Sequence, residues 1–74
     1  MKVPRGVSGE RLVRVLEHLG YGIVRQKGSH VRLICGGRNP VTVPLHETLD
    51  RGTLRAIIRT VEISVEEFIR LLGK

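Results

Sequence analysis

Hydrophobic residues recur at helical spacing near the start of the chain. Between Ser8 and Gly20, four of them share one face at the i, i+3, i+4, i+7 spacing: Leu12, Val15, Leu16 and Leu19. Serine is favoured just before a helix and glycine just after one, so the pattern predicts a helix over residues 8–19. The other face of this helix is polar and typical of a solvated surface: Arg11, Arg14, Glu17 and His18.

From Tyr21 onward the pattern is that of β-strands. Segments 22–26 and 30–35 are rich in β-branched residues, and Lys27-Gly28-Ser29 between them is typical of a hairpin turn. The alternation in the first strand leaves two candidates for its core position: Ile23 and Val24.

A second turn, at residues 36–39, leads to a third strand at residues 41–43. Pro40 and Pro44 bracket this strand, as residues at strand ends do. In the second strand, alternate residues form a core face: Val31, Leu33 and Cys35. The others form the opposite face: His30, Arg32 and Ile34.

Two more helices are predicted in the last third of the chain. Thr53 is placed to cap a helix with four apolar residues at helical spacing: Leu54, Ile57, Ile58 and Val61. Ser64-Val65-Glu66-Glu67 is a capping box, and Ile63 and Phe68 have the spacing of a hydrophobic staple. The last helix has an apolar stripe and ends at Gly73: Val65, Phe68, Ile69 and Leu72.

The predicted fold class is therefore α+β, with the order helix, three strands, helix, short helix in a single domain over residues 1–74. We expect a three-stranded antiparallel sheet with the helices on one face. Because three helices can cover only one face of a sheet of this size, the face that carries His30 and Arg32 is predicted to be open.

Length and charge limit the kinds of site available. A chain of 74 residues, 41% of them hydrophobic, has room for one small core, because chains of this size bury only roughly 60% of their unfolded surface. A broad, shallow working surface is expected rather than a deep cleft. Thirteen Lys and Arg residues against seven Asp and Glu give a net charge of +6, which favours a polyanionic partner.

The rest of the composition argues against several kinds of site. Cys35 is the single cysteine, so the chain has no internal disulfide, and the cytoplasm is the expected location. No apolar run is long enough to span a membrane, and no contact with membranes is expected. The carboxylates do not pair at metal-site or acid–base spacing, so we expect no metal and no cofactor.

Histidine is the remaining side chain that titrates near neutrality and could move protons. His18 lies on a polar helix face, and His46 lies in a loop, where it could serve the structure or contact a substrate. His30 follows a glycine turn on the open face, with three cations around it: Arg25, Lys27 and Arg32. These could hold a phosphodiester while His30 exchanges a proton with a ribose 2′-hydroxyl or a leaving oxygen. The alternative is a half-exposed strand residue in a solvated basic face.

Aromatic residues are scarce. The chain has only Tyr21 and Phe68, and Phe68 belongs to a helix staple. The sheet therefore lacks the stacking platform of typical single-strand binders. We expect recognition through backbone charge, which weakens steeply with salt.

Several elements in order resemble the HicA-type (YcfA-like) toxin family, small mRNA interferases of toxin–antitoxin pairs. The most specific are Gly28-Ser29-His30 after a basic strand, Pro44-x-His46, and Gly52-Thr53-Leu54. The resemblance also takes in Ser8-Gly9 and Leu19-Gly20-Tyr21, so that it covers nearly the whole chain.

The resemblance implies a double-stranded-RNA-binding-domain-like fold, α-β-β-β-α, to which the helix at 64–72 is an addition. It implies ribonuclease activity on mRNA, with the catalytic histidine at His30 and a HicB-type antitoxin as the partner that covers the active face. The expected RNA contacts come from five residues: Arg25, Lys27, Ser29, Arg32 and His46. Close backbone approach, to another segment or to the RNA, is expected at Gly22 and Gly28.

The leading hypothesis is thus an endoribonuclease toxin of a type II toxin–antitoxin system. A non-catalytic RNA-binding module that uses the same basic face is the alternative. A purely structural interaction protein without RNA affinity is a third reading.

Overall fold

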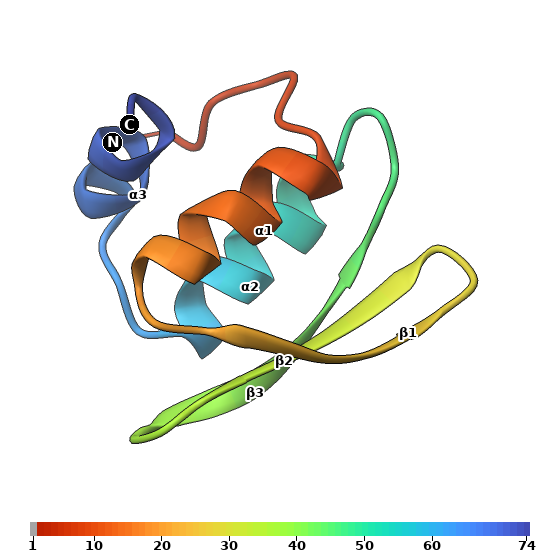
Figure 1. The fold of residues 1–74 in the computed structure, drawn as a ribbon. Helices are drawn as coiled ribbons and strands as arrows, with labels where there is room; N and C mark the ends of the chain where they lie inside the picture. The colour runs from red at the N-terminus through yellow and green to blue at the C-terminus, as the bar shows by residue number, and fades with distance from the viewer. Residues whose placement is uncertain (1) are drawn as a thin grey trace.

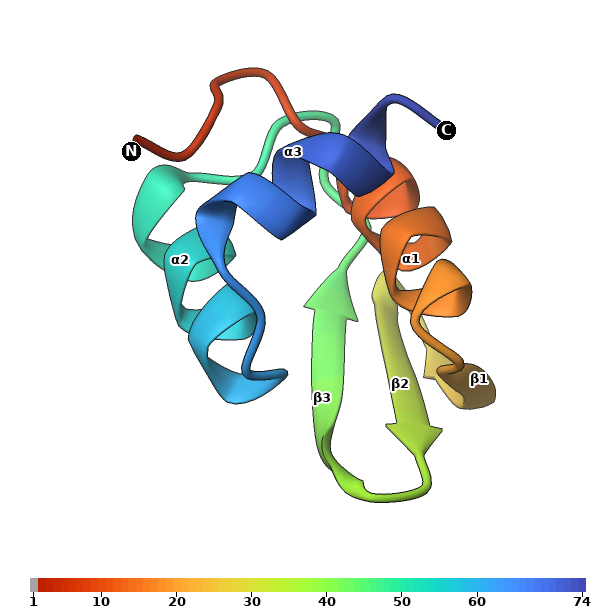
Figure 2. The ribbon, with the colours of Figure 1, turned by 90° about the vertical axis from the view of Figure 1, so that its left-hand side faces the viewer.

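The computed structural model describes residues 2–74, which form a three-stranded sheet and three helices (Figure 1). In chain order the elements are α1 (Gly9–His18), β1 (Gly22–Lys27), β2 (His30–Cys35), β3 (Arg38–Pro44), α2 (Arg51–Thr60) and α3 (Val65–Leu72). The strands are antiparallel in the order β1-β2-β3, and the helices lie on one face of the sheet (Figure 2). The predicted double-stranded-RNA-binding-domain-like order with an added C-terminal helix is confirmed.

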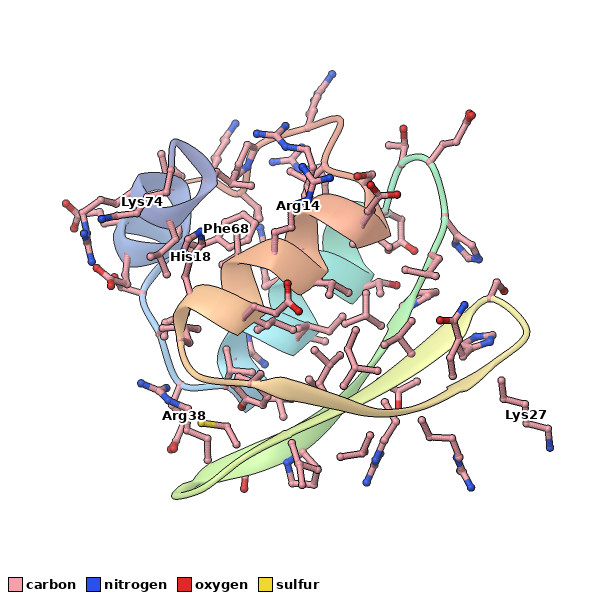
Figure 3. The ribbon with its side chains drawn as sticks, viewed as in Figure 1. Arg14, His18, Lys27, Arg38, Phe68 and Lys74 are labelled. Carbon is pink, nitrogen blue, oxygen red and sulfur yellow. The ribbon has the colours of Figure 1, made fainter. Side chains whose placement is uncertain are left out.

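The core lies between the helices and the sheet. Its buried side chains are hydrophobic and form one cluster, to which all three helices contribute. The predicted core face of α1 is confirmed, since Leu12, Val15 and Leu16 are all buried. Phe68 of α3 is fully buried and lies between α3 and α1 (Figure 3). Burial of a side chain of this size contributes about 1.5–3 kcal/mol, so α3 is part of the fold and not an appendage.

The N-terminal caps fix where each helix begins. The Ser8 hydroxyl accepts a hydrogen bond from the Arg11 backbone N–H at 3.1 Å, as predicted for α1. For α2 the predicted cap, Thr53, is wrong. Asp50 is the cap, because its carboxylate accepts from both the Thr53 backbone N–H and the Thr53 hydroxyl, each at 2.8 Å. The helix therefore begins at Arg51, before the residue that the sequence pattern favoured.

This cap predicts a pH-dependent contribution to stability. The hydrogen bond from the Thr53 backbone N–H is the main cause that holds the pKa of the Asp50 carboxyl below its usual value. A carboxylate with a lowered folded-state pKa stabilises the fold above its unfolded pKa and loses this effect as pH falls through the folded pKa. We expect Asp50→Ala to lower the melting temperature at neutral pH, with a difference from wild type that shrinks below about pH 4.

Thermal unfolding between pH 7 and pH 3 measures this effect. Asp50→Asn is the matched control, because asparagine keeps the capping oxygen without the charge. A difference between wild type and Asp50→Ala that stays constant over this range would contradict the role of the charge.

The apolar stripe of α3 differs in part from the prediction. Phe68 is buried as expected, but Ile69 is 39% exposed and Leu71 is buried in its place. The capping box is also incomplete. The Ser64 hydroxyl accepts from the Glu67 backbone N–H at 3.0 Å, whereas the Glu67 carboxylate accepts from Arg70 Nε at 3.0 Å. The hydrogen bond from Arg70 lowers the pKa of Glu67, so this side chain is committed to α3 itself.

β3 is longer than predicted, because it includes Pro40 and Pro44. Proline fits here since β3 is an edge strand, where a missing N–H need not break the ladder. The start of the strand is tied to the end of α2: an Arg38 guanidinium nitrogen donates to the Val61 carbonyl oxygen at 2.6 Å, and the Asn39 amide donates to that of Thr60 at 3.0 Å. These bonds hold the sheet against the helices at the end remote from the Gly28 turn.

β1 departs most from the sequence pattern. Neither candidate for its core position is buried, because Ile23 is 50% and Val24 is 54% exposed. The strand lies at the sheet edge, and its register shifts between Ile23 and Arg25, as at a β-bulge. Its core-facing side is therefore not covered by a helix.

Within residues 2–74, no helix is both long enough and apolar enough to cross a membrane.

Candidate functional site

The outer face of the sheet is open, as predicted from the alternation in β2. Val31 and Leu33 are buried toward the helices, and Cys35 is partly buried against the core. His30 and Arg32 are exposed on the opposite face, where no helix lies (Figure 1). The side that carries the predicted chemistry is thus the uncovered side.

The strand register gathers the basic residues of this face. Lys27 pairs with His30, and Arg25 pairs with Arg32, across β1 and β2. Directly paired residues of antiparallel strands have Cβ atoms about 4.5–5.5 Å apart. Together with Thr42 of β3, these four line one shallow hollow of about 530 Å³, which we call the sheet hollow. Among residues 2–74, no carboxylate lines the sheet hollow, so it is a site of positive potential.

The turn before His30 places this residue on the central strand. Gly28 has a φ of +60°, which glycine adopts without strain, so the chain reverses within Gly28 and Ser29. His30 then pairs with Lys27 on one side and Pro44 on the other. The Ser29 carbonyl oxygen accepts from the Leu45 N–H at 2.6 Å, which ties the turn to the end of β3. The backbone under the His30 side chain is therefore held on both sides.

Thr42 is a residue of this site that the sequence reasoning missed. It lies opposite Arg32 in the β2–β3 register, and its hydroxyl accepts from an Arg32 guanidinium nitrogen at 3.1 Å. The alternation Val41-Thr42-Val43 could have indicated this residue, because side chains of a strand alternate between the two faces. Val41 and Val43 are both buried, so Thr42 faces the open side. Thr42 thus orients one cation of the sheet hollow.

The other side chains of the sheet hollow are free to meet a ligand. Within residues 2–74, no side-chain hydrogen bond or ion pair engages Arg25, Lys27 or His30. The two aromatic side chains are unavailable for stacking on bases, since Tyr21 and Phe68 are both buried. Tyr21 donates its hydroxyl to the Asn39 carbonyl oxygen at 2.8 Å, and burial raises its pKa. The open face therefore offers charge and hydrogen bonds but no aromatic platform.

The remaining predicted residues lie outside the sheet hollow. Ser29 is in the exposed turn next to it. His46 lines a separate hollow at the start of α1, together with Glu10 and Glu47. Within residues 2–74, a Cβ atom at Gly22 would meet no atom within 4 Å apart from its chain neighbours, so the expected close approach to another segment is wrong there, and approach to RNA stays a prediction. The same open space surrounds Gly28, whose left-handed backbone explains the glycine.

No cluster of three or more histidine, cysteine, aspartate or glutamate side chains within residues 2–74 could hold a metal ion.

These features define a class: small α+β proteins that present a basic, uncovered sheet face with a histidine on its central strand. Among models of known families, the one described as "HicA toxin of bacterial toxin-antitoxin" matches residues 9–63. The chain belongs to the HicA toxin family, which implies an antitoxin as its partner. The match runs from the first residue of α1 to just beyond α2, and so includes the whole sheet. No curated protein matches the chain.

Proposed function

We propose that this protein is an endoribonuclease that cleaves mRNA on the open face of the sheet. One observation carries the proposal: Arg25, Lys27, Arg32 and His30 line one hollow without a carboxylate. Cations in this arrangement attract the phosphodiester backbone and stabilise charge that develops on phosphate during cleavage. The family membership supports the toxic outcome, since cleavage of mRNA stops translation.

In the proposed reaction His30 is the general acid or base. The 2′-oxygen forms a bond to phosphorus while the bond from phosphorus to the leaving oxygen breaks. His30 either takes the proton from the ribose 2′-hydroxyl or gives a proton to the leaving oxygen, and water exchanges the other proton. Arg25, Lys27 and Arg32 hold the phosphate. Cleavage of a defined mRNA in the presence of a chelator tests the proposal: product formed under these conditions supports it, and cleavage that stops with chelation contradicts the metal-independent mechanism.

A HicB-type antitoxin is the proposed partner that covers this face. Next to the basic residues, β2 exposes an apolar side chain that a soluble protein benefits from covering: Ile34, which is 49% exposed. Ile34 follows the alternation of His30 and Arg32 on β2, so a partner that packs on it would lie beside the sheet hollow. Because the site is shallow, such a partner blocks it without inserting deeply.

A second candidate function is RNA binding without cleavage. It is favoured by the absence, within residues 2–74, of any hydrogen-bonded group that orients the His30 ring, since catalytic bases are commonly oriented by a third group. In that case the wild-type protein binds mRNA in a salt-dependent manner and forms no product.

Thr42 provides a test of how the sheet hollow holds phosphate. We expect Thr42→Val to raise KM roughly 2- to 10-fold with little change in kcat, because it removes one hydrogen bond to Arg32 worth about 0.5–1.5 kcal/mol. Valine keeps the β-branched shape, so the strand should persist. Steady-state cleavage kinetics measure the effect.

Thr42→Ser is the matched control, because serine keeps the hydroxyl and should restore KM. A serine variant as impaired as the valine variant would show that the hydrogen bond to Arg32 does not matter.

A further inference from the structure

A second basic hollow lies on the helix side of the molecule, away from the sheet hollow. It lies between α1 and α3, has a volume of about 140 Å³, and we call it the α1–α3 groove. Seven residues line it: Arg11, Arg14, Val15, His18, Leu71, Leu72 and Lys74. In Figure 3, Arg14 and His18 lie on the helix side of the molecule and Lys27 lies beside the sheet.

The fold explains how the α1–α3 groove forms. Arg11, Arg14 and His18 have the i, i+3, i+7 spacing that places them along one face of α1. Val15 and Leu71 are buried between the two helices and form an apolar floor. The polar face of α1 is therefore not only a solvated surface, because α3 adds a second wall and a fourth basic residue, Lys74.

The side chains that line the α1–α3 groove carry no negative charge. Within residues 2–74, no aspartate or glutamate side chain lines it. Glu10 pairs with Arg14 at 3.2 Å, but both side chains are at least 70% exposed, and exposed pairs at this spacing stabilise a helix only weakly. Within residues 2–74, no side-chain hydrogen bond occupies Arg11, His18 or Lys74. A phosphate group can therefore bind these side chains without displacing a strong interaction.

We propose that the α1–α3 groove is a second phosphate-binding site, which holds a backbone phosphate of the RNA outside the stretch that lies at the sheet hollow. The choice of RNA as the ligand rests on the proposed function. The apolar floor limits solvent on one side, which strengthens the attraction between the cations and a phosphate. The molecule measures only 31 × 27 × 21 Å, so one strand that passes around the edge of the sheet reaches both sites. The bound RNA would thus wrap the protein instead of lying flat on the sheet.

The test compares two double variants that remove the same charge. Arg11→Gln/Arg14→Gln alters the α1–α3 groove, and Arg55→Gln/Arg59→Gln alters two exposed positions of α2. Both are made in a His30→Ala background, which prevents cleavage of the probe under the proposed function. The probe is a fluorescent single-stranded RNA of about 20 nucleotides, titrated at several salt concentrations.

We expect the groove variant to bind roughly 10-fold more weakly, with a salt slope of log K reduced by about 0.7, because each neutralised phosphate of a single strand contributes about 0.7. The α2 variant should change much less. Equal changes in the two variants, or no change in the groove variant, would overturn the proposed site.

The failure of the proposed function gives a different result. If the wild-type protein forms no product while the groove variant still loses affinity, the cleavage proposal fails and the phosphate site stands. If the wild-type protein cleaves mRNA and the groove variant binds like its control, the cleavage proposal stands and the phosphate site in the α1–α3 groove fails. A wild-type protein that does not bind the probe overturns both.

Discussion

Replacement of His30 by alanine is expected to slow RNA cleavage by roughly 100- to 10,000-fold, the usual contribution of a general acid or base. RNA affinity should change little, because the cations supply most of the attraction to the backbone. The fold should be unaffected, since His30 is exposed and makes no side-chain hydrogen bond within residues 2–74. Single-turnover cleavage of a defined mRNA, with binding and thermal unfolding measured on the same preparations, checks all three expectations.

The matched control for this experiment is Arg59→Gln, an exposed substitution on α2 far in sequence from the sheet. It should cleave at the wild-type rate. If His30→Ala cleaves as fast as this control, His30 is not the catalytic group. If neither protein cleaves while both bind RNA, the chain is an RNA-binding module, and the sheet hollow serves affinity alone.

The two halves of the site have different roles in this scheme. His30 carries the chemistry, whereas Arg25, Lys27 and Arg32 carry the affinity. The separation follows from the sheet, because pairing places Lys27 opposite His30 and Arg25 opposite Arg32 in one hollow, without a side-chain hydrogen bond from His30 within residues 2–74. It also explains why a loss of cleavage without a loss of binding is the most informative outcome for this protein.

Strand β2 was predictable from the sequence because it is the central strand and only one of its faces is covered. Its alternation therefore matches burial residue by residue, with Val31 and Leu33 inside and His30 and Arg32 outside. The helices were predictable for a similar reason, since each has one buried stripe. The hollow around His30 follows from β2 and the short turn that Gly28 allows.

Other features do not follow from the hydrophobic pattern, because they depend on the position of a strand in the sheet, on one local side-chain hydrogen bond, or on the packing of distant helices. The exposure of Ile23 and Val24 follows from the edge position and bulge of β1. Asp50 caps α2 because its carboxylate, three residues before Thr53, accepts hydrogen bonds from both the backbone N–H and the hydroxyl of Thr53. The α1–α3 groove needs α3 to pack against α1, which no local pattern specifies.

Contacts with a distant part of the chain leave no room for a side chain at Gly9. A Cβ atom at this position would lie 2.1 Å from the Pro44 carbonyl oxygen and 2.8 Å from the Leu45 Cα atom. Both are backbone atoms, which cannot swing aside as a side chain does. The Gly9 N–H also donates to the His46 carbonyl oxygen at 3.0 Å, so α1 begins in direct contact with the end of β3.

We therefore expect Gly9→Ala to lower the free energy of unfolding by about 3 kcal/mol, the upper part of the range for overpacking. A domain of this length has a total stability of only about 4–11 kcal/mol, so the loss is a large share of it. Chemical denaturation of the two proteins measures the difference. Gly22→Ala is the matched control, because a Cβ atom there would meet no atom of the chain within 4 Å, and its stability should be unchanged or slightly raised.

The same substitution should also affect the site. Pro44, which a Cβ atom at residue 9 would displace, is the β3 partner of His30. Cleavage by Gly9→Ala should therefore fall even at temperatures where the variant is folded, whereas Gly22→Ala keeps its fold and loses activity only if RNA approaches that backbone. A Gly9→Ala protein as stable and as active as wild type would mean that the 44–46 segment moves freely, and that the start of α1 does not support the position of His30.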